Sequence, residues 1–525
     1  MARNIFYAIS IIGILIVGLF QVFWPPITWL LVLLVPYILL GLYDMNFSEH
    51  NVLRNYPVIG HMRYALDSIS PEIRQYFIET NESGRPYNRQ QRNLIYARAE
   101  DGLQTQPFGT QWDVLEVGYG RANHSLAPKT VDPSKERITV GGPDCKKPYM
   151  ASRLNISAMS FGALSPNAIH ALNAGAKRGG FAHNTGEGGI SPYHLAGGGD
   201  IVWQLGTGYF GCRAADGGFD AEKFKANANR DVVKMIEIKL SQGAKPAHGG
   251  VLPAAKVDAE IAEIRGVPMG EDVLSPPAHS AFSTPEGLLE FVSQLREMTD
   301  GKPIGFKLCV GKRSEFMGIC KAMLKTGIIP DFITVDGAEG GTGAAPLEFS
   351  NRLGVPINEG LSFVHNCLVG IGLRDKIRVI ASAKVVTGFD MMEKLALGAD
   401  MCNVARPMMF ALGCIQSLRC NTNQCPTGIA TQDKKRAEAV DVEVRQIRVA
   451  NFHAATLESF RELVGACGLD DPDQLKPHHI LQRVANETEQ PFDEIYDFLA
   501  EGELLTKKIH PCFKSDWEEA KAEAF

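Results

Sequence analysis

The chain has 525 residues, of which 45% are hydrophobic, 21% are charged and 52 are glycine. These proportions are typical of a globular α/β enzyme with many tight loops, and the length leaves room for two or three domains. The net charge of −6 gives no overall basic signal, so nucleic-acid binding is not expected.

Eleven cysteines in a chain of this length do not indicate a disulfide scaffold. Eight stand singly, often within apolar runs such as GFKLCV around Cys309, where a buried free thiol is the usual interpretation. The remaining three, Cys414, Cys420 and Cys425, fall within a dozen residues. This distribution favours a reducing compartment over an oxidising one.

Two apolar runs open the chain. Residues 5–24 carry no charge and are about as long as a bilayer-spanning helix, and residues 27–43 form a second uncharged run with Trp and Tyr near its ends. A signal peptide would need a small-residue cleavage site after the first run, and a buried core hairpin is the other alternative. We predict that residues 1–45 form a transmembrane helical hairpin.

Cationic residues flank this hairpin on both sides. Arg3 precedes it, and Arg54, His61 and Arg63 follow it. By the positive-inside rule, both ends and the body of the protein are expected in the cytoplasm. Residues 46–150 are polar and rich in arginine, and we predict a linking subdomain with one amphipathic helix at 71–80 and no catalytic cluster.

The main body, residues 151–433, alternates short β-like runs with amphipathic segments such as 285–298, 316–326 and 388–397. There are eight such runs, and many end in glycine-rich loops. This pattern predicts an α/β fold of the (β/α)8 TIM-barrel type. An open doubly wound sheet would need a G-x-G-x-x-G after a first strand, which the sequence lacks in that context. Residues 434–525 are charged, have no glycine-rich loops, and are predicted to form a helical extension.

In such barrels the active site lies where the strands end, and a phosphate site often follows strands seven and eight. Here those loops are 381–388 and 403–408, in which small residues precede a helix start and Lys384 and Arg406 add charge. The alternative is that these small residues only allow close packing of helix on strand.

Two more glycine-rich loops follow predicted strands. In VDGAEGGTGAAP, Asp336 ends a strand, and four glycines within seven residues let the backbone approach a flat or phosphorylated ligand. In NTGEGG, Glu187 stands at the centre, and a merely solvated glutamate is the alternative.

Cationic and amide side chains gather after another strand. Lys239, Gln242 and Lys245 lie at and just beyond its end, and Arg265 follows. A lysine, an amide and a bidentate arginine suit a ligand with a carboxylate and a carbonyl. Lys307, inside the apolar run IGFKLCV, could face a reduced flavin, with a buried ion pair as the alternative.

The three clustered cysteines have the spacing C-x5-C-x4-C, with Pro426 directly after the last. Neither a second pair nor a histidine is near enough in sequence to complete a tetrahedral zinc site. Three thiolates in one loop suit an iron–sulfur cluster, with three irons or with a distant fourth ligand. Three unrelated buried cysteines are the other interpretation.

With these motifs in view, residues 154–433 resemble the synthase domain of the glutamate synthase large subunit, in its short FMN-binding bacterial branch. The resemblance rests on SAMSFGALS, NTGEGG, KLSQGAKP, GGTGAAP and GCIQSLRCNTNQCPTGIATQD. It implies a barrel with FMN and a 3Fe–4S cluster, which makes glutamate from 2-oxoglutarate and ammonia. Since the sequence shows no second dinucleotide fold, electrons are expected to come from another protein. In a bacterium the anchoring membrane would be the inner one.

The resemblance and the residue chemistry together give a set of expected roles. Catalytic roles are expected for Glu187, Lys239 and Lys307, and cluster ligation for Cys414, Cys420 and Cys425. The substrate-binding residues are expected to be Ser160, Gln242, Lys245 and Arg265. The cofactor-binding residues are expected to be Ser157, Met159, Asp336, Gly341, Thr342, Gly343, Ser382, Lys384, Gly388 and Arg406.

The sequence also departs from the family pattern. Full-length members begin with a glutaminase domain, whereas this chain begins with the apolar runs, so we expect ammonia to come from solution or from a partner. The loop at 382–384 reads Ser-Ala-Lys where the family often has Asp-Gly-Gln. Two alternatives remain: a flavin dehydrogenase for another amino or keto acid coupled to a membrane carrier, and a non-catalytic anchored scaffold.

Overall fold

A computed structural model describes residues 2–525 of the chain. It divides into two compact units, of which the first ends at Arg89 and the second runs from Gln90 to Phe525.

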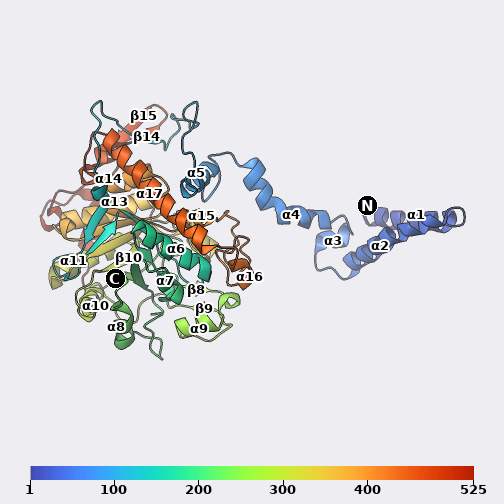
Figure 1. Ribbon diagram of the computed structural model, residues 1–525, viewed down its shortest axis with the longest axis horizontal. Coiled ribbons are helices and arrows are strands. Elements are labelled where there is room, and N and C mark those ends of the chain that lie inside the picture. The colour runs from blue at the N-terminus through green and yellow to red at the C-terminus, as the bar shows by residue number, and fades with distance from the viewer. Residues whose placement is uncertain (1) are drawn as a thin grey trace. The chain divides into compact units, whose positions relative to one another are not determined.

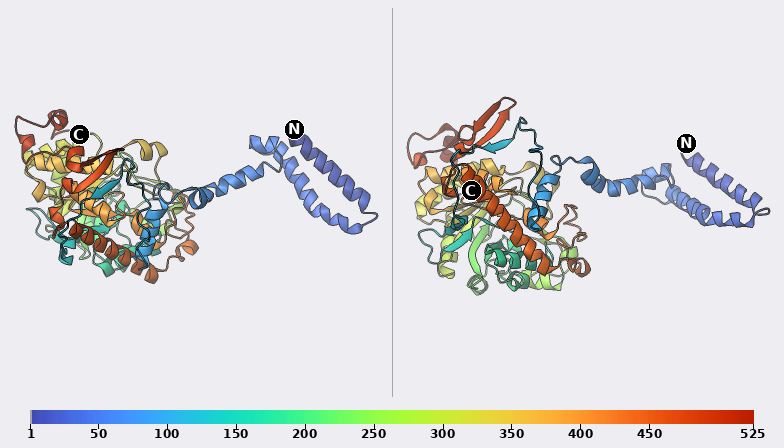
Figure 2. Two further views of the ribbon diagram at one scale, coloured as in Figure 1. Left: turned by 90° about the horizontal axis from the view of Figure 1, so that it is seen from above. Right: turned by 45° about the horizontal axis from the view of Figure 1, so that its top comes forward.

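The first unit begins with two long apolar helices, α1 (Ala2–Phe20) and α2 (Leu31–Asn46), joined by the 3-10 turn η1 (Pro25–Leu30). They lie side by side as a hairpin in each view (Figures 1 and 2). By length and composition, α1 and the stretch Pro25–Asn46 could each cross a membrane. Within this unit most of their side chains are exposed, which does not fit a hairpin buried in a soluble core.

Short helices follow the hairpin: α3 (Asn51–Asn55), α4 (His61–Ile73) and the π-helical turn η2 (Arg74–Ile78). The helix predicted to start at Pro71 therefore starts ten residues earlier, at His61. Proline is common at the first turn of a helix, but here Pro71 lies inside α4, and the widened turn of η2 follows within one turn of it.

The second unit is built on a closed barrel of eight parallel strands, each of which pairs with the next in the chain. The strands are β4 (Leu154–Ile156), β5 (His183–Asn184), β6 (Ile201–Leu205), β7 (Val233–Lys239), β10 (Ile304–Cys309), β11 (Phe332–Asp336), β12 (Arg378–Ser382) and β13 (Met401–Val404). Each of the eight predicted runs overlaps one of these strands. The prediction of a (β/α)8 barrel is confirmed.

Helices surround the barrel (Figure 1). They include α6 (Pro166–Gly179), α7 (Pro192–Ala196), α8 (Ala221–Ala228), α9 (Ala259–Arg265), α10 (Pro285–Met298), α11 (Arg313–Thr326), α12 (Leu347–Arg352), α13 (Ile357–Gly370), α14 (Gly388–Ala396) and α15 (Arg406–Leu412). The three amphipathic segments predicted from the sequence coincide with α10, α11 and α14. A small antiparallel pair, β8 (Val251–Leu252) with β9 (Val273–Leu274), is inserted between β7 and α10.

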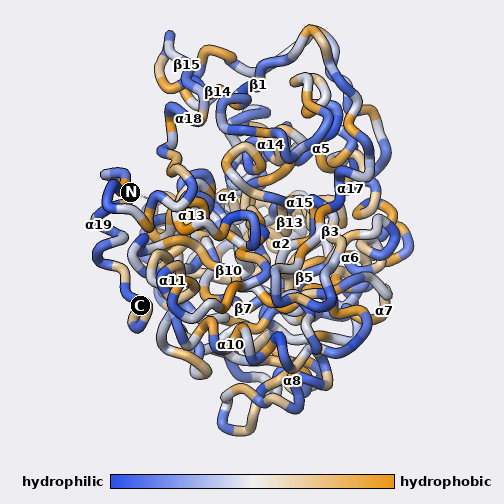
Figure 3. Tube along the Cα trace, turned by 90° about the vertical axis from the view of Figure 1, so that its left-hand side faces the viewer, coloured by the Kyte–Doolittle hydropathy of each residue, from blue (hydrophilic) through white to orange (hydrophobic). Residues whose placement is uncertain are grey.

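The hydrophobic core closes one end of the barrel. Strands β2 (Arg137–Val140) and β3 (Tyr149–Ser152) form a hairpin whose Ile138, Val140 and Tyr149 pack with interior residues of the barrel, including Met235 and Phe332. The central strands run largely in tan and orange in Figure 3, with much of the blue toward the outside. Because this hairpin plugs the start of the strands, the opposite end is left for a site.

The segment after Asp433 contains the expected helices, chiefly α16 (Lys434–Ala437), α17 (Val442–Ala466), α18 (Phe492–Ile495) and α19 (Pro511–Glu519). It also contains an antiparallel strand pair, β14 (Ile480–Ala485) and β15 (Thr488–Pro491), which joins β1 (Gly120–Ala122) in a three-stranded sheet. The helix α5 (Arg89–Ala99) stands at the boundary of the two units. The prediction of a helix at 480–491 rested on charge and was wrong. One of the strands that pairs with this segment, β1, comes from residues 120–122, too far away in the sequence to be recognised as its partner.

Candidate active site

The ends of the barrel strands bring several predicted residues to one face of the molecule. Lys239 and Asp336 are the last residues of β7 and β11, and Ser382 is the last residue of β12. Glu187 lies in a short turn, Gly186–Gly188, just after β5. Parallel strands in a closed barrel all end at the same rim, so this arrangement follows from the fold.

Glu187 and Lys239 form an ion pair at this rim. Nζ of Lys239 lies 2.7 Å from Oε1 of Glu187, and the carboxylate side chain is 19% exposed. Burial acts to raise the pKa of Glu187, but the charges of Lys239, Lys245 and Arg265 outweigh it and hold the pKa below its ordinary value. Glu187 is therefore an ionised, paired carboxylate and not a solvated loop residue.

Lys245 and Arg265 add two further buried cations. Burial lowers the pKa of Lys245 to about 8 and that of Arg265 to about 10, while Glu187 acts in the opposite direction on both. Nη2 of Arg265 donates to the carbonyl oxygen of Phe161 at 3.0 Å, and its Nε has no hydrogen-bond partner. A buried donor without a partner marks a place where a ligand oxygen could bind.

One pocket joins these groups to residues from other loops. Its wall contains four predicted substrate or catalytic residues, Ser160, Glu187, Lys245 and Arg265. It also contains the predicted cofactor residues Thr342 and Gly343, the predicted cluster ligand Cys420, and Phe210, Lys256 and Ser275. Gln242 is not in this wall, but its buried Nε2 has no partner.

Lys307 lies deeper, in β10, and forms the buried ion pair that was its alternative interpretation. Its Nζ is 3.3 Å from Oδ2 of Asp336, and Oδ2 of Asp336 also accepts the backbone N–H of Gly243 at 3.1 Å. Burial acts to lower the pKa of Lys307, but Asp336 and Glu237 outweigh it and raise the pKa above the ordinary value. Lys307 is thus a fixed cation below the rim.

Glu237 was not predicted as a site residue, although it faces the barrel interior. Its carboxylate accepts hydrogen bonds from Asn184 at 2.8 Å, Gln204 at 2.6 Å and Thr334 at 2.7 Å. The charged residue in the apolar run MIEIK was the signal that could have identified it, since acidic residues are rarely buried without partners.

The glycine-rich loop after β11 lies against Arg406, the first residue of α15. Nη2 of Arg406 donates to the carbonyl oxygen of Glu339 at 2.7 Å. A Cβ on Gly341 would lie 2.7 Å from Nε of Arg406, so any larger residue there would force the Arg406 side chain to shift. The structure thus brings two predicted cofactor residues from distant segments into contact.

The loops after β4 and β12 also meet. The hydroxyl oxygens of Ser157 and Ser382 lie 3.2 Å apart, and Lys384 has the left-handed backbone conformation, with φ of 53°. Met159 is buried next to the Glu187 turn: a Cβ on Gly186 would lie 3.1 Å from the backbone nitrogen of Met159.

Gly388 shows the packing role that was its alternative interpretation. A Cβ at this position would lie 2.5 Å from the backbone nitrogen of Phe460 in α17. The start of α14 therefore packs directly on α17. Asp390 accepts the N–H groups of Val386 and Thr387 at 2.7 and 2.8 Å, so part of this helix start is already bound.

The cysteine loop follows α15 and is shaped by left-handed residues, Gln416, Leu418 and Asn423, with φ of 58°, 57° and 61°. The backbone N–H of Gln416 approaches Sγ of Cys414 at 3.4 Å, and Sγ of Cys425 lies 3.4 Å from the hydroxyl of Thr427. Donors directed at sulfur are a common feature of iron–sulfur sites.

The three thiols differ in their electrostatic surroundings. Burial raises the pKa of Cys414 to about 12, and burial with the nearby Cys425 raises that of Cys420. For Cys425, burial acts to raise the pKa, but the Thr427 hydroxyl and three backbone N–H groups outweigh it and lower the pKa. Cys425 is therefore the thiol best prepared to ionise.

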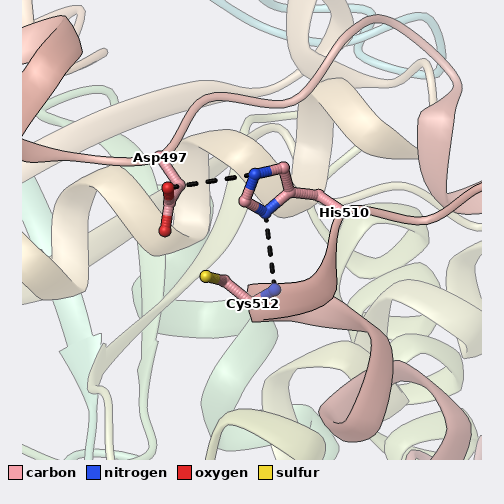
Figure 4. A group of neighbouring side chains, drawn as sticks. All are labelled: Asp497, His510 and Cys512. Carbon is pink, nitrogen blue, oxygen red and sulfur yellow. Dashed lines mark hydrogen bonds and ion pairs between the residues drawn. The ribbon is translucent and has the colours of Figure 1, made fainter.

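A second candidate metal site lies outside the cysteine loop, at Asp497, His510 and Cys512. Within residues 2–525 it is the one group of three histidine, cysteine or acidic side chains whose ligand atoms all lie within 4.8 Å of one another. Nδ1 of His510 accepts the backbone N–H of Cys512 at 3.4 Å and caps α19 (Figure 4). Its Nε2, 3.9 Å from Asp497, then carries the proton of the neutral ring and has no lone pair for an ion. This group is a helix cap.

Comparison with known proteins gives the family. The model of the conserved region in glutamate synthase matches residues 112–470, more than half of the chain. The chain belongs to the glutamate synthase family. It is accordingly an enzyme of the glutamate synthase type, an oxidoreductase.

Two relatives show the extent of this likeness. The chain is 38% identical over 481 residues to the glutamate synthase large subunit-like protein YerD of Bacillus subtilis, covering 84% of this chain and 91% of that protein. It is 36% identical over 322 residues to an archaeal glutamate synthase (NADPH) of Methanocaldococcus jannaschii, covering 61% of this chain and 60% of that protein.

Solved structures with a similar chain path are more distant. A double mutant of flavocytochrome b2 with pyruvate bound has a TM-score of 0.42 and 12% identity, covering 83% of this chain and 92% of that one. A mutant mandelate oxidase with 2-hydroxy-phenylacetamide has a TM-score of 0.40 and 16% identity, covering 82% and 96%. Likeness at this level says nothing about ligands or activity.

Proposed function

We propose that the protein catalyses the reductive amination of 2-oxoglutarate to glutamate, with ammonia from solution or from a partner protein. The observation that carries this proposal is the pocket in which Ser160, Lys245 and Arg265 meet Thr342 and Cys420. One wall of that pocket suits a dicarboxylate, and its other walls come from the loops predicted to hold a flavin and a cluster.

Charge supports the choice of substrate. Lys239, Lys245 and Arg265 bring three cations to Glu187, so two positive charges remain for a ligand. The unpartnered Nε of Arg265 and Nε2 of Gln242 offer donors to carboxylate or carbonyl oxygens. A dianion with a keto group would neutralise the excess charge and supply both kinds of acceptor.

Glu187 and Lys239 are proposed to manage the protons of the reaction. When ammonia condenses with the keto carbon, the keto oxygen leaves as water and needs protons. Nζ of Lys239, at the rim and 2.7 Å from Glu187, can give a proton to that oxygen and receive one back through the carboxylate.

The residues around the pocket fit FMN. Oδ1 of Asn403, in β13, is buried without a partner, and Gly341 lets its loop lie directly against Arg406, where a Cβ would come within 2.7 Å of Nε. We propose that the group is held by Ser157, Met159, Asp336, Gly341, Thr342, Gly343, Ser382, Lys384, Gly388 and Arg406, with Lys307 as the cation below it. The chemistry that FMN supplies when bound is hydride transfer to the imine carbon.

The cysteine loop fits an iron–sulfur cluster. The sulfurs of Cys414, Cys420 and Cys425 do not form a group within 4.8 Å, whereas the ligands of a single ion would. Cysteines that each bind a different iron of a 3Fe–4S cluster can stand further apart. The chemistry that the cluster supplies when bound is the transfer of single electrons, here from an unidentified donor protein.

The helical hairpin α1–α2 is proposed to anchor the protein in the membrane, with the catalytic unit in the cytoplasm. Its support is the length and apolar character of both helices together with their exposure within the first unit. The full chain should remain in the membrane pellet after a carbonate wash. Release into the supernatant would contradict the anchor.

The activity is tested directly on anaerobically purified protein. Chemically reduced protein mixed with ammonium chloride and 2-oxoglutarate should yield glutamate and reoxidise the flavin, and omission of ammonium should abolish the product. If no glutamate forms while another keto or amino acid reoxidises the flavin, the enzyme is a dehydrogenase for that acid. Colourless protein without flavin or iron would leave only a scaffold.

A further inference from the structure

Lys256 lies where three loops meet at the mouth of the barrel. It ends the short 3-10 turn Ala254–Lys256. Its Nζ donates to the carbonyl oxygen of Ala163, in the loop after β4, at 3.1 Å, and to that of Ala430, after the three cysteines, at 3.0 Å. One side chain thus connects a substrate loop to the cysteine loop.

A second contact strengthens this junction. Nδ2 of Asn423, between Cys420 and Cys425, donates to the carbonyl oxygen of Ala255 at 3.0 Å. The turn that carries Lys256 is therefore held to the cysteine loop from both sides. Lys256 also lines the pocket together with Ser160, Arg265 and Cys420.

The cation is buried and has no acidic partner. The side chain is 3% exposed, and within residues 2–525 no carboxylate lies within 4.0 Å of its Nζ. Burial lowers the pKa of Lys256 to about 8, and the nearby Cys420 and Cys425 act in the opposite direction, so the side chain is still a cation at neutral pH. A buried cation that is bound only by neutral carbonyls leaves its charge available to whatever the cysteines hold.

We infer that Lys256 is a positioning residue that holds the cysteine loop against the substrate pocket and whose charge favours the reduced form of the cluster. This inference rests on the cluster in the proposed function. Each electron that the cluster accepts makes it more negative by one charge. A fixed cation stabilises that charge, and the effect is stronger where protein replaces water.

The competing explanation is that Lys256 only satisfies backbone carbonyls. Lys302 provides the matched control for this role, because it is also buried and its Nζ donates to the carbonyl oxygens of Ala228, Arg230 and Val233 at 2.7, 3.0 and 2.7 Å. It stands just before β10, at the opposite end of the barrel, and no cysteine acts on its charge.

The experiment compares wild type with Lys256→Met, Lys256→Arg and Lys302→Met, each purified anaerobically with its cofactors. Iron per chain and the EPR-monitored midpoint of the cluster are measured. In Lys256→Met the equilibrium between reduced and oxidised cluster should move about tenfold toward the oxidised form, which is about 59 mV for one electron. Lys256→Arg and Lys302→Met should stay within about threefold of wild type.

Each result has a consequence. Wild-type protein without iron would overturn the proposed cluster and this inference with it. Iron-loaded Lys256→Met with an unchanged midpoint would overturn the inference alone. If Lys256→Met cannot hold iron, Lys256→Arg decides: iron with a wild-type midpoint supports the role of the charge, and loss of iron there as well overturns it.

Discussion

The pocket wall and the cysteine loop are neighbours, and their electrostatics are opposite. In the wall, Glu187 lies among Lys239, Lys245 and Arg265, so unlike charges stabilise one another before any ligand arrives. In the loop, three thiols lie together, and the nearby Cys425 helps to raise the pKa values of both Cys420 and Cys414. The wall is therefore prepared for an anion, whereas the loop needs a cationic centre to hold its thiolates together.

Removing a thiol should give the largest effect, because residues 414–425 contain no carboxylate or histidine that could replace the lost ligand. We expect Cys414→Ser, Cys420→Ser and Cys425→Ser each to reduce iron to near zero. Iron per chain and the EPR signal measure this. Cys467→Ser, at the end of α17, is the control and should keep its iron. Full iron in all three loop variants would show that the loop is not the cluster site.

Removing a cation from the wall should weaken binding without affecting iron. We expect Arg265→Ala to bind 2-oxoglutarate about 30- to 100-fold more weakly, since losing one partner of a buried charge pair costs about 2–3 kcal/mol. Calorimetric titration of the oxidised enzyme measures the affinity. Arg178→Ala, an exposed site at the end of α6, should bind as wild type does. Equal affinity in both variants would exclude Arg265 from the substrate site.

The pH dependence of binding tests how Glu187 supports the wall. The pKa of Lys245 is lowered to about 8, so its charge is present below pH 8 and is lost above it. Affinity for 2-oxoglutarate should therefore fall as pH rises through about 8. Lys245→Arg should remove this inflexion, and Glu187→Gln should move it to lower pH, because Glu187 raises the pKa of Lys245. An inflexion unchanged in Lys245→Arg would assign the titration to another group.

The smallest effect concerns the loop before α14, where a ligand role and a packing role compete. A Cβ on Gly388 would lie 2.5 Å from the backbone of Phe460, so Gly388→Ala should cost about 1–3 kcal/mol and lower the Tm. Gly311→Ala is the control, since no atom lies within 4 Å of its Cβ. Lost FMN at an unchanged Tm would instead assign Gly388 to the flavin site.

The barrel itself could be predicted from the sequence because each strand is a short β-rich run, many of these runs end in glycine-rich loops, and there are eight of them, the number that closes a TIM barrel. The ion pair of Glu187 with Lys239 could not be predicted in the same way. Both residues were selected singly, but their 2.7 Å contact depends on β5 and β7 ending at the same rim.

Residues whose contacts lie far away in the chain could not be predicted from the sequence. Lys256 looks like an ordinary lysine after LPAA, and its partners Ala163 and Ala430 are 93 and 174 residues away. The strand β14 was also missed: one of its partners, β1, lies far upstream, although the other, β15, follows it directly in the chain. Helix α4 was misplaced because Pro71 normally marks a helix start, while here it stands inside one.

The small sheet of β1, β14 and β15 has a consequence for biosynthesis. Arg121 in β1 forms hydrogen bonds with Glu489 in β15, 368 residues later. All eight barrel strands lie between Arg121 and Glu489 in the chain. The barrel can therefore close on the ribosome before the strands that pair with β1 have been synthesised. The sheet therefore forms only after residues 480–491 have been synthesised. A chain that stops short of residue 480 would leave β1 as an unpaired edge, accessible to proteases and to other chains.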